Sequence, residues 1–494
     1  MAIFSDNRFH QAKDTPLYQQ IYAHMQAAIL SGELKRGLKL PSTRALADEL
    51  RISRNTVLNA YRQLIAEGYL ESAGGSGTFV ARVLPESLLT TPGRKAPAKT
   101  GRTKPRTPRI SEHAMLQMAV YKIDGAATPS NSRLPRPFAS GTPALDAFPY
   151  AIWSRLIARQ ARRMPDSSFA YQDAAGYRPL REAIAAHVTV SRRVHCTPEQ
   201  IVIVPGAQGA LDLAARILLD AGDAVWMEDP GYPGARGAFL GVNAKIVPVP
   251  IDNDGLVVEA GMAKAPKARL VYLTPSHQFP LGVTMSLSRR LALLDWARRA
   301  NAYILEDDYD SEYRYAGRPL ASLQGLDDVE RVIYIGTFSK VLFPALRIGY
   351  LILPQPLVDT FLTVKSLIDV HNPLLEQAVL TDFMLEGHFV RHLRRMRTLY
   401  AERRKALIKA ASGLPLEIYS PEAGIHCIGW LPKGMDDLAL IRRAANYDLD
   451  LWPVSYFCIE PLARKGLLLG FAGYSVPKIK DGIHKLSLAM SAMR

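Results

Sequence analysis

Apolar residues at the start of the chain recur at helical spacing. From Leu17 onward, Ile21, Met25 and Ile29 fall on one face of a helix, with polar residues between them. Gly32 follows the last of these positions, and glycine tolerates the left-handed geometry found at a helix end. The pattern therefore predicts an amphipathic first helix.

Two more helices are predicted directly afterwards. Ser42 is placed to cap the second helix, in which Leu46 and Leu50 point inward. Ser53 is placed to cap the third helix in the same way. The inward face of this third helix is expected to contain Val57, Tyr61, Leu64 and Ile65.

A pair of short strands completes this segment. Residues 69–72 and 78–80 have strand-like composition and flank the turn Gly74-Gly75-Ser76-Gly77. Three helices followed by such a hairpin form a winged helix-turn-helix, which we expect to span residues 14–82.

A winged helix of this kind binds DNA when its third helix enters the major groove. The early residues of that helix lie away from its buried face, as contacts to base edges require. The residues predicted to contact double-stranded operator DNA are Arg54, Asn55 and Thr56 at base edges, Ser42 and Arg44 at phosphates, and Gly75, Gly77 and Thr78 in the wing. The alternatives are a winged helix that binds another protein and a basic face that is only solvated.

The pattern changes between residues 83 and 136. Prolines at 85, 92, 97, 105 and 108 interrupt any helix, and the seven basic residues between 94 and 109 have no acid among them. We expect a flexible, basic, Pro-rich linker, because such a segment cannot bury a core. Its charge either adds nonspecific attraction to phosphates or belongs to a soluble spacer.

From residue 137 to 494, apolar strand-like runs alternate with helical periods. The runs are residues 201–204, 224–227, 270–273, 303–305 and 332–335. Strands this apolar are buried on both faces, and their alternation with helices predicts an α/β domain with a mostly parallel central sheet. Ligands of such sheets collect at the carboxyl ends of the strands.

Residues that suit one cofactor lie near these strand ends. Lys340, in Thr337-Phe338-Ser339-Lys340, can form an imine with an aldehyde, and Asp307 can keep a pyridine nitrogen protonated. Tyr309 can hydrogen-bond a phenolic oxygen, and Tyr232 can stack on the ring. Together these side chains predict a site for pyridoxal 5′-phosphate.

The phosphate of this cofactor needs an anion site. Gly206, Ala207 and Gln208 lie between a strand and a helix, where free backbone N–H groups and the helix dipole attract an anion. Thr337 and Arg347 offer a hydroxyl and a bidentate cation. We further expect cationic neighbours and exclusion of water to lower the pKa of the nearby lysine, so that its amine can react.

These motifs together resemble a known family. Residues 40–44, 53–57 and 67–80 resemble the DNA-binding domain of the GntR regulators. From about Phe138 the chain is similar to the fold type I aminotransferases, and the combination resembles the MocR/GabR regulators. The motifs that carry the second similarity are Pro205-Gly206-Ala207-Gln208, Glu228-Asp229-Pro230-Gly231-Tyr232, Thr274-Pro275-Ser276-His277-Gln278-Phe279-Pro280, Glu306-Asp307-Asp308-Tyr309-Asp310 and Gly336-Thr337-Phe338-Ser339-Lys340.

The resemblance implies a role for each candidate residue. Those roles are the Schiff-base lysine for Lys340, the pyridinium partner for Asp307, the phenolic-oxygen donor for Tyr309, the stacking ring for Tyr232, and phosphate ligands for Thr337 and Arg347. Tyr171 looks like the tyrosine that reaches the phosphate of the partner subunit, which implies a homodimer built head to tail.

Two features depart from the pattern of working aminotransferases. Phe279 stands where those enzymes usually carry an asparagine, and residues 464–471, where those enzymes hold the substrate carboxylate with an arginine, do not align securely with that arginine. We therefore expect the aminotransferase-like domain to sense a ligand, with residual transaminase activity left open.

The leading hypothesis is a pyridoxal phosphate-dependent transcriptional regulator of the GntR/MocR type. A small amine or amino acid effector would displace Lys340 by forming an external aldimine, and DNA binding would change as a result. The alternatives are an active aminotransferase with an accessory DNA-binding module and a sensor of pyridoxal phosphate itself.

Composition and charge narrow the class of partner and the expected cellular compartment. The net charge of +15 favours a polyanionic partner. Cys196, Cys427 and Cys458 lie far apart, so we expect no disulfide framework, no metal site and a reducing cytoplasm, with the protein at the nucleoid. Residues 1–14 lack the apolar core of a signal peptide, and we expect no membrane association.

Overall fold

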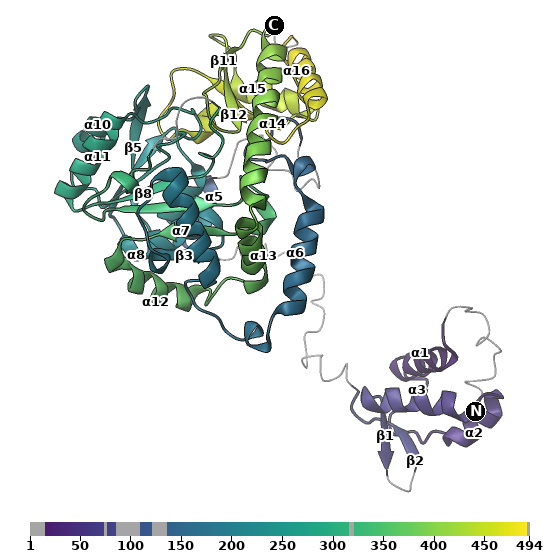
Figure 1. The fold of residues 1–494 in the computed structure, drawn as a ribbon. Helices are drawn as coiled ribbons and strands as arrows, with labels where there is room; N and C mark the ends of the chain where they lie inside the picture. Colours follow the sequence, from purple (N-terminus) through teal and green to yellow (C-terminus); the bar gives the residue numbers. More distant parts are fainter. Residues whose placement is uncertain (1–14, 74–76, 85–108, 121–135, 316–320, 492–494) are drawn as a thin grey trace. The chain divides into compact units, whose positions relative to one another are not determined.

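The computed structural model describes residues 15–73, 77–84, 109–120, 136–315 and 321–491. The chain divides into two compact units, residues 1–108 and 109–494, and both are drawn in Figure 1. Among the sequence predictions, Gly75 and most of the expected linker lie outside the described residues.

The first unit consists of three helices and a hairpin. Its elements are α1 (Leu17–Leu30), α2 (Thr43–Leu50), α3 (Arg54–Ala66), β1 (Leu70–Ala73) and β2 (Gly77–Val80). The two predicted caps are present: Ser42 Oγ accepts from the Ala45 N–H at 3.2 Å, and Ser53 Oγ accepts from the Asn55 N–H at 3.3 Å. The strands β1 and β2 pair antiparallel, as a wing requires.

The helices of this unit enclose one small core. Val57, Tyr61 and Leu64 of α3 are buried as expected. Ile65 is not, because its side chain is 37% exposed, and Ala60 takes the remaining inward position on α3. Helical geometry explains the correction, since Ala60 lies four residues before Leu64 on the same face, whereas Ile65 is turned by about 100° from Leu64.

A helix lies inside the segment that we expected to be a flexible linker. This helix, α5 (Glu112–Val120), belongs to the second unit and packs against α9 (Pro233–Gly241). The side-chain amide of Gln117 donates to the carbonyl of Gly237 at 2.9 Å. A Cβ atom at Gly241 would lie 2.4 Å from the Gln117 amide nitrogen, so a glycine there permits the close approach. Residues 109–120 contain no proline, which leaves them free to form a helix.

The second unit is built around an eight-stranded sheet. Its strand order is β3-β10-β9-β8-β7-β4-β5-β6, in which β10 and β6 run antiparallel to their neighbours and the other pairs are parallel. The strands are β3 (Ile201–Val204), β4 (Ala224–Asp229), β5 (Lys245–Asp252), β6 (Gly255–Leu256), β7 (Leu270–Leu273), β8 (Tyr303–Asp308), β9 (Val332–Thr337) and β10 (Gly349–Ile352).

Helices cover both faces of this sheet, which is why its strands are apolar throughout. In β3, Ile201 and Ile203 enter one apolar cluster while Val202 and Val204 enter another on the opposite face. The face of Val202 is covered by α8 (Gly206–Leu218), α9 and α12 (Val358–Ile368). The opposite face is covered by α6 (Tyr150–Arg163), α7 (Arg178–Arg192), α10 (Val258–Lys264), α11 (Leu287–Ala300), α13 (Leu374–Leu385) and α14 (His388–Ala411).

The C-terminal part of the unit adds a smaller antiparallel sheet of order β11-β12-β14-β13. In Figure 1 the long helix α14 runs from the region of α13 to the region of this sheet. The elements are β11 (Glu417–Tyr419), β12 (His426–Trp430), α15 (Asp437–Ala445), β13 (Trp452–Pro453), the short 3₁₀ helix η9 (Val454–Phe457), β14 (Gly466–Gly470) and α16 (Val476–Ser491).

Across the parts of the chain described above, we find no helix whose length and apolar character would let it span a bilayer.

Candidate functional site

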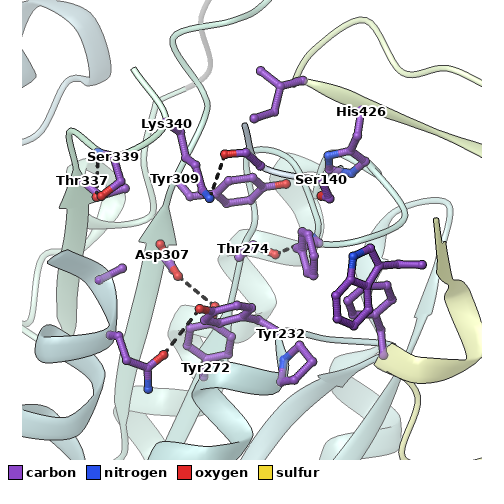
Figure 2. A pocket seen from close by; sticks show the side chains of 18 of the residues that line it. Ser140, Tyr232, Tyr272, Thr274, Asp307, Tyr309, Thr337, Ser339, Lys340 and His426 are labelled. Atoms are coloured by element: carbon purple, nitrogen blue, oxygen red, sulfur yellow. Dashed lines mark hydrogen bonds between the residues drawn. The ribbon is translucent and has the colours of Figure 1, made fainter. Parts of the chain in front are cut away.

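A cavity of about 340 Å³ opens at the carboxyl ends of the parallel strands. Strand β8 brings Asp307 to it, β9 brings Thr337, and Ala207 enters from the first turn of α8. Figure 2 shows Lys340, Tyr309, Asp307 and Tyr232 arranged around this one space. Because these segments are strand ends and the start of a helix, backbone hydrogen bonds fix the points from which the side chains enter the cavity.

Lys340 is half-buried at one side of the cavity. Its Nζ donates to the carbonyl of Gly141 at 3.1 Å. A Cβ atom at Gly141 would lie only 2.5 Å from that Nζ, so the absence of a side chain there makes room for the amine. Burial is the main cause that lowers the pKa of Lys340, while Asp310 and Asp307 raise it and Arg347 lowers it.

The reason that we expected for the low lysine pKa therefore needs correction. Exclusion of water lowers the pKa of Lys340, but two of the three charged neighbours that act on it are acids. Arg347 alone supplies the expected cationic effect among them, as the last of the causes. The free amine is thus favoured mainly by loss of hydration.

Asp307 presents one free carboxylate oxygen to the site. Its Oδ2 accepts a hydrogen bond from the Tyr272 hydroxyl at 2.8 Å. Its Oδ1 is buried and has no hydrogen-bond partner among the described residues. Burial raises the pKa of Asp307 to about 7, and the hydrogen bond from Tyr272 opposes that rise. A protonated ring nitrogen would give Oδ1 a partner and would stabilise the ionised carboxylate.

The anion end of the cavity is formed at the start of α8. Gly206 has a φ of +81°, and a Cβ atom there would lie 3.2 Å from the guanidinium nitrogens of Arg347. The same guanidinium donates to the carbonyl of Pro205 at 2.6 Å. Thr337, at the end of β9, accepts from the Ser339 N–H at 3.2 Å, so its own hydroxyl proton can be donated to a ligand. These groups suit a phosphate.

Tyr232 lies at the N-terminal end of α9, next to Gln208. The Gln208 amide donates to the carbonyl of Gly234 at 2.9 Å, and the Tyr232 hydroxyl donates to Gln208 Oε1 at 3.4 Å. The ring of Phe279 meets Tyr232 edge to face, with centroids 5.9 Å apart. The Tyr232 ring therefore has a fixed orientation on the wall of the cavity.

Tyr309 contacts His277, which in turn contacts Asp310, and the sequence motifs gave no role to either of these two buried side chains. The Nδ1 atom of His277 lies 2.9 Å from the Tyr309 hydroxyl oxygen and 3.1 Å from both carboxylate oxygens of Asp310. His277 and Asp310 are each 1% exposed. With Nδ1 protonated, His277 donates toward both oxygens, and the Tyr309 proton is free to point into the cavity.

The three consecutive acidic residues at the end of β8 have different roles. Glu306 accepts from the N–H groups of Leu323 and Gln324, and Asp308 pairs with Arg192 at 2.7 Å. Those two carboxylates support the fold, whereas Asp307 is the one among them that lines the cavity.

Tyr171 does not reach the cavity within its own chain. Its side chain is 87% exposed, and its ring lies edge to face against His371 with centroids 6.2 Å apart. Of the other predicted cofactor residues, all but Gly206 line the cavity directly, and Gly206 adjoins Ala207.

Several lining residues were missed by sequence reasoning. They are Ser140, Gly141, Pro233, Tyr272, Thr274, Ser339, Ile425, His426, Trp452, Tyr456 and Phe457. Phe279 was noticed for its departure from a motif and now proves to line the cavity. Tyr272 and Thr274 could have been found, because they end or follow a predicted strand beside that of Asp307. The residues from 425 onward give no local signal.

Comparison with known proteins agrees with both units. Residues 17–80 match the family of bacterial regulatory proteins called gntR, and residues 138–457 match aminotransferase class I and II. Over 97% of its length the chain is 41% identical to a probable rhizopine catabolism regulatory protein, MocR, of Rhizobium meliloti, of which 95% is covered. The chain belongs to the MocR group of GntR-family transcriptional regulators.

Other relatives support this assignment. The chain is 33% identical to the HTH-type transcriptional regulator TauR of Rhodobacter capsulatus, with 94% of each chain covered. It is 30% identical to the pyridoxine biosynthesis transcriptional regulator PdxR of Corynebacterium glutamicum, over 97% of this chain and 96% of that one.

Solved structures match the second unit of this MocR-type regulator. An archaeal alanine:glyoxylate aminotransferase has a TM-score of 0.69 at 30% identity, covering 78% of this chain and 96% of the enzyme. A Pyrococcus horikoshii kynurenine aminotransferase solved with PMP has a TM-score of 0.67 at 28% identity, covering 78% and 95%. The predicted fold class, pyridoxal phosphate as the cofactor, and a DNA-binding transcriptional regulator are thus confirmed.

Proposed function

We propose that this regulator holds pyridoxal phosphate on Lys340 and uses it to sense a small amine or amino acid that changes operator binding. The observation that carries the proposal is the pairing, across one cavity, of the amine of the half-buried Lys340 with a buried aspartate that has one carboxylate oxygen without a partner among the described residues. Pyridoxal phosphate supplies an aldehyde that bonds reversibly to primary amines, and a pyridine nitrogen that a carboxylate can hold protonated.

Each wall of the cavity has a separate task in this proposal. Lys340 provides the amine, Asp307 binds the ring nitrogen through Oδ1, Tyr309 donates to the phenolic oxygen and Tyr232 stacks on the ring. The phosphate lies against Gly206, Ala207, Gln208, Thr337 and Arg347. The orphaned Oδ1 atom and the side-chain-free space at Gly206 both suit these assignments.

The winged helix supplies the DNA contacts. Arg54 and Asn55 are exposed at the start of α3, next to the half-buried Thr56, and are proposed to meet base edges. Ser42 keeps its hydroxyl proton for a phosphate, because its oxygen is the atom that caps α2. Arg44 adds a phosphate contact, and Gly75, Gly77 and Thr78 form the wing contacts.

We further propose a homodimer built head to tail. The exposure of Phe169 at 79% and Tyr171 at 87% supports it, because large exposed rings close together in sequence commonly mark a contact surface. In such a dimer Tyr171 would reach the phosphate of the partner subunit. The regulator would act on DNA in the cytoplasm, at the nucleoid, with domains at 14–82 and 137–494, and with α5 of the segment between them packed on the second domain.

An effector regulates only through a difference in its affinity for two arrangements of the dimer. Such coupling free energies are typically about 1 to 3 kcal/mol, which changes operator affinity roughly 5- to 150-fold. If the effector amine took the place of Lys340 on the cofactor, Lys340 would be released as a free amine, the form that donates to Gly141 in this structure, so the two states would differ in contacts around residue 141. That difference provides a physical basis for coupling.

A second candidate function is a sensor of pyridoxal phosphate itself. It is favoured by the 30% identity to a regulator that is named for pyridoxine biosynthesis. Operator affinity would then change with the cofactor alone and need no amine. An active aminotransferase is the third candidate, and multiple turnovers with ordinary amino acids would support it.

The test is an operator-binding titration with three forms of the protein: cofactor-free, cofactor-loaded, and cofactor-loaded with an amine. The proposal expects the third form to differ from the second. Equal operator affinity of these two forms across a broad set of primary amines and amino acids contradicts it, and a change between the first two alone supports the cofactor sensor.

A further inference from the structure

Aromatic rings form the wall of the cavity that faces away from the anion end. Phe279 packs edge to face on Phe457 with centroids 5.1 Å apart, and Phe457 packs edge to face on Tyr456 at 5.2 Å. Trp452 continues the wall, 4.8 Å from the Tyr456 ring. All four rings line the cavity. They come from the turn after β7 and from the segment β13–η9, so two distant parts of the chain meet to make one apolar surface.

The cations of the cavity are already engaged elsewhere. Lys340 and Arg347 are the only Lys or Arg side chains among the described residues that line it. The first is the amine that the effector replaces, and the second donates to Pro205 at the anion end beside Gly206. Neither is positioned at the aromatic wall to bind a carboxylate.

The histidine at this wall carries no charge. The Nε2 atom of His426 lies 3.0 Å from the carbonyl of Pro280, to which a neutral ring donates its proton. Burial, together with His277 nearby, lowers the pKa of His426 to about 3. The ring of Phe279 lies edge to face against it at 5.8 Å. His426 therefore extends the wall as a neutral ring.

Buried acids lie in and around the cavity. Asp307 lines it, Glu228 accepts a hydrogen bond from the lining residue Thr274, and Asp310 lies against His277, which contacts Tyr309. A ligand carboxylate at the aromatic wall would lose its hydration without a cation to replace it. Burial of a charge in that way is strongly unfavourable, whereas burial of a ring gains roughly 25 cal/mol for each Å² removed from water.

We propose that the effector of this regulator is a primary amine that carries an aromatic or similarly flat apolar ring and has no carboxylate. The inference rests on the proposed function, because it names the class of amine that reaches the cofactor. The amine goes to the cofactor, and the ring packs on Phe279, Trp452, Tyr456 and Phe457. Selectivity against amino acids arises because no described cation at this wall compensates a carboxylate.

The experiment compares matched pairs of ligands that differ only in a carboxylate. Cofactor-loaded protein is titrated with phenethylamine and with phenylalanine, then with tyramine and with tyrosine, and the change of the cofactor absorbance gives each dissociation constant. Free pyridoxal phosphate, titrated in parallel, corrects for reaction in solution. We expect each amine to bind at least tenfold more tightly than its amino acid. Equal or tighter binding of the amino acids overturns the inference.

Three variants test whether the aromatic wall determines the preference. Trp452→Ala should weaken phenethylamine at least fivefold and leave methylamine, which has no ring, within twofold, while Trp452→Phe should restore most of the loss. Tyr456→Arg supplies a cation and should shift the preference toward phenylalanine. A Trp452→Ala protein that binds both amines like the parent overturns the assigned wall.

Failure of the inference and failure of the proposed function give different results. A protein that shows no absorbance of bound pyridoxal phosphate after the cofactor is supplied refutes the proposed function and this inference together. A protein that takes up the cofactor and then responds to phenylalanine but not to phenethylamine overturns this inference alone.

Discussion

The Tyr272 hydroxyl donates a 2.8 Å hydrogen bond to one carboxylate oxygen of Asp307, and the other oxygen has no partner among the described residues. The pair leaves one acceptor pointed at the place where the ring nitrogen is proposed to bind. We predict that Asp307→Asn weakens retention of pyridoxal phosphate at least tenfold, because an amide cannot hold the nitrogen protonated. Equilibrium dialysis measures the retention.

Tyr272→Phe is the matched control for that change. It removes the neighbouring hydrogen bond and keeps the carboxylate, so the loss of cofactor affinity should be smaller than in Asp307→Asn. It should also raise the pKa of Asp307, because the hydrogen bond from Tyr272 now lowers it. Equal retention of cofactor by Asp307→Asn and the parent protein contradicts the assigned role.

The buried carboxyl of Glu228 leads us to predict that the free energy of unfolding depends on pH. This carboxyl is 2% exposed and accepts from Thr274 N–H and Oγ1 at 3.0 and 2.8 Å, and burial raises its pKa from 4.5 to about 8. The folded state then binds the proton more tightly than the unfolded chain, so the free energy of unfolding falls as pH rises between about 4.5 and 8.

The measurement is denaturant unfolding of cofactor-free protein at pH 5 and at pH 8. Glu228→Gln should remove about 3 kcal/mol or less of the fall in unfolding free energy between these pH values, as one titrating group can supply. Glu259→Gln, at an exposed position of α10, should leave the fall unchanged. An unaltered pH dependence in Glu228→Gln would mean that this carboxyl is already ionised at pH 5.

Arg54 tests the DNA-binding face. If its guanidinium contacts a base edge, Arg54→Ala should weaken specific operator binding by about 1 to 3 kcal/mol. Arg36→Ala removes the same charge from an exposed position between α1 and α2 and should weaken specific and nonspecific DNA alike. Binding assays at several salt concentrations separate the two effects. Unchanged operator affinity in Arg54→Ala rejects the base contact.

His277 is predicted to position Tyr309 without touching the ligand. Its Nδ1 atom lies 2.9 Å from the Tyr309 oxygen, so His277→Ala should let the phenol turn away from the cofactor. The absorbance maximum of the bound cofactor and its pH dependence should move in the same direction as in Tyr309→Phe. A double variant should add little to either single change, because both act through one contact. Fully additive shifts would show that the two residues act independently.

The amphipathic helices of the DNA-binding unit could be predicted because their signal is local. The caps Ser42 and Ser53 and the inward positions Val57 and Leu64 follow from spacing within one helix. Ile65 was assigned wrongly because it is apolar and adjacent to a buried residue, and composition alone does not separate neighbouring positions.

The central sheet was also predictable, whereas the small sheet was not. Strands such as β3 and β7 are continuous apolar runs, but β8 extends past its apolar residues to Asp308 because pairing with β9 continues there. Strands β11 and β13 are short, and they exist only because they pair with residues distant along the chain. The spacing of apolar residues along the sequence gives no information on such pairing.

Part of the candidate site had a sequence signal. Lys340, Asp307 and Tyr309 lie at strand ends within motifs, so chemistry and position agreed. The aromatic wall had no sequence signal, because Trp452 and Phe457 meet Phe279 only through the packing of the small sheet region. The acidic neighbours that raise the pKa of Lys340 also required the structure, since residue types alone do not tell which charges lie close to the amine.

The central claim is the covalent attachment of pyridoxal phosphate to Lys340, and one measurement tests it most directly. The purified protein and Lys340→Ala are each supplied with pyridoxal phosphate, freed of excess and scanned at the edge of the visible range, with borohydride reduction and peptide mapping to locate the bond. We predict a band in the parent protein, its loss in Lys340→Ala, and a cofactor adduct on the peptide that contains Lys340. A colourless parent protein, or an adduct on another lysine, would contradict the account.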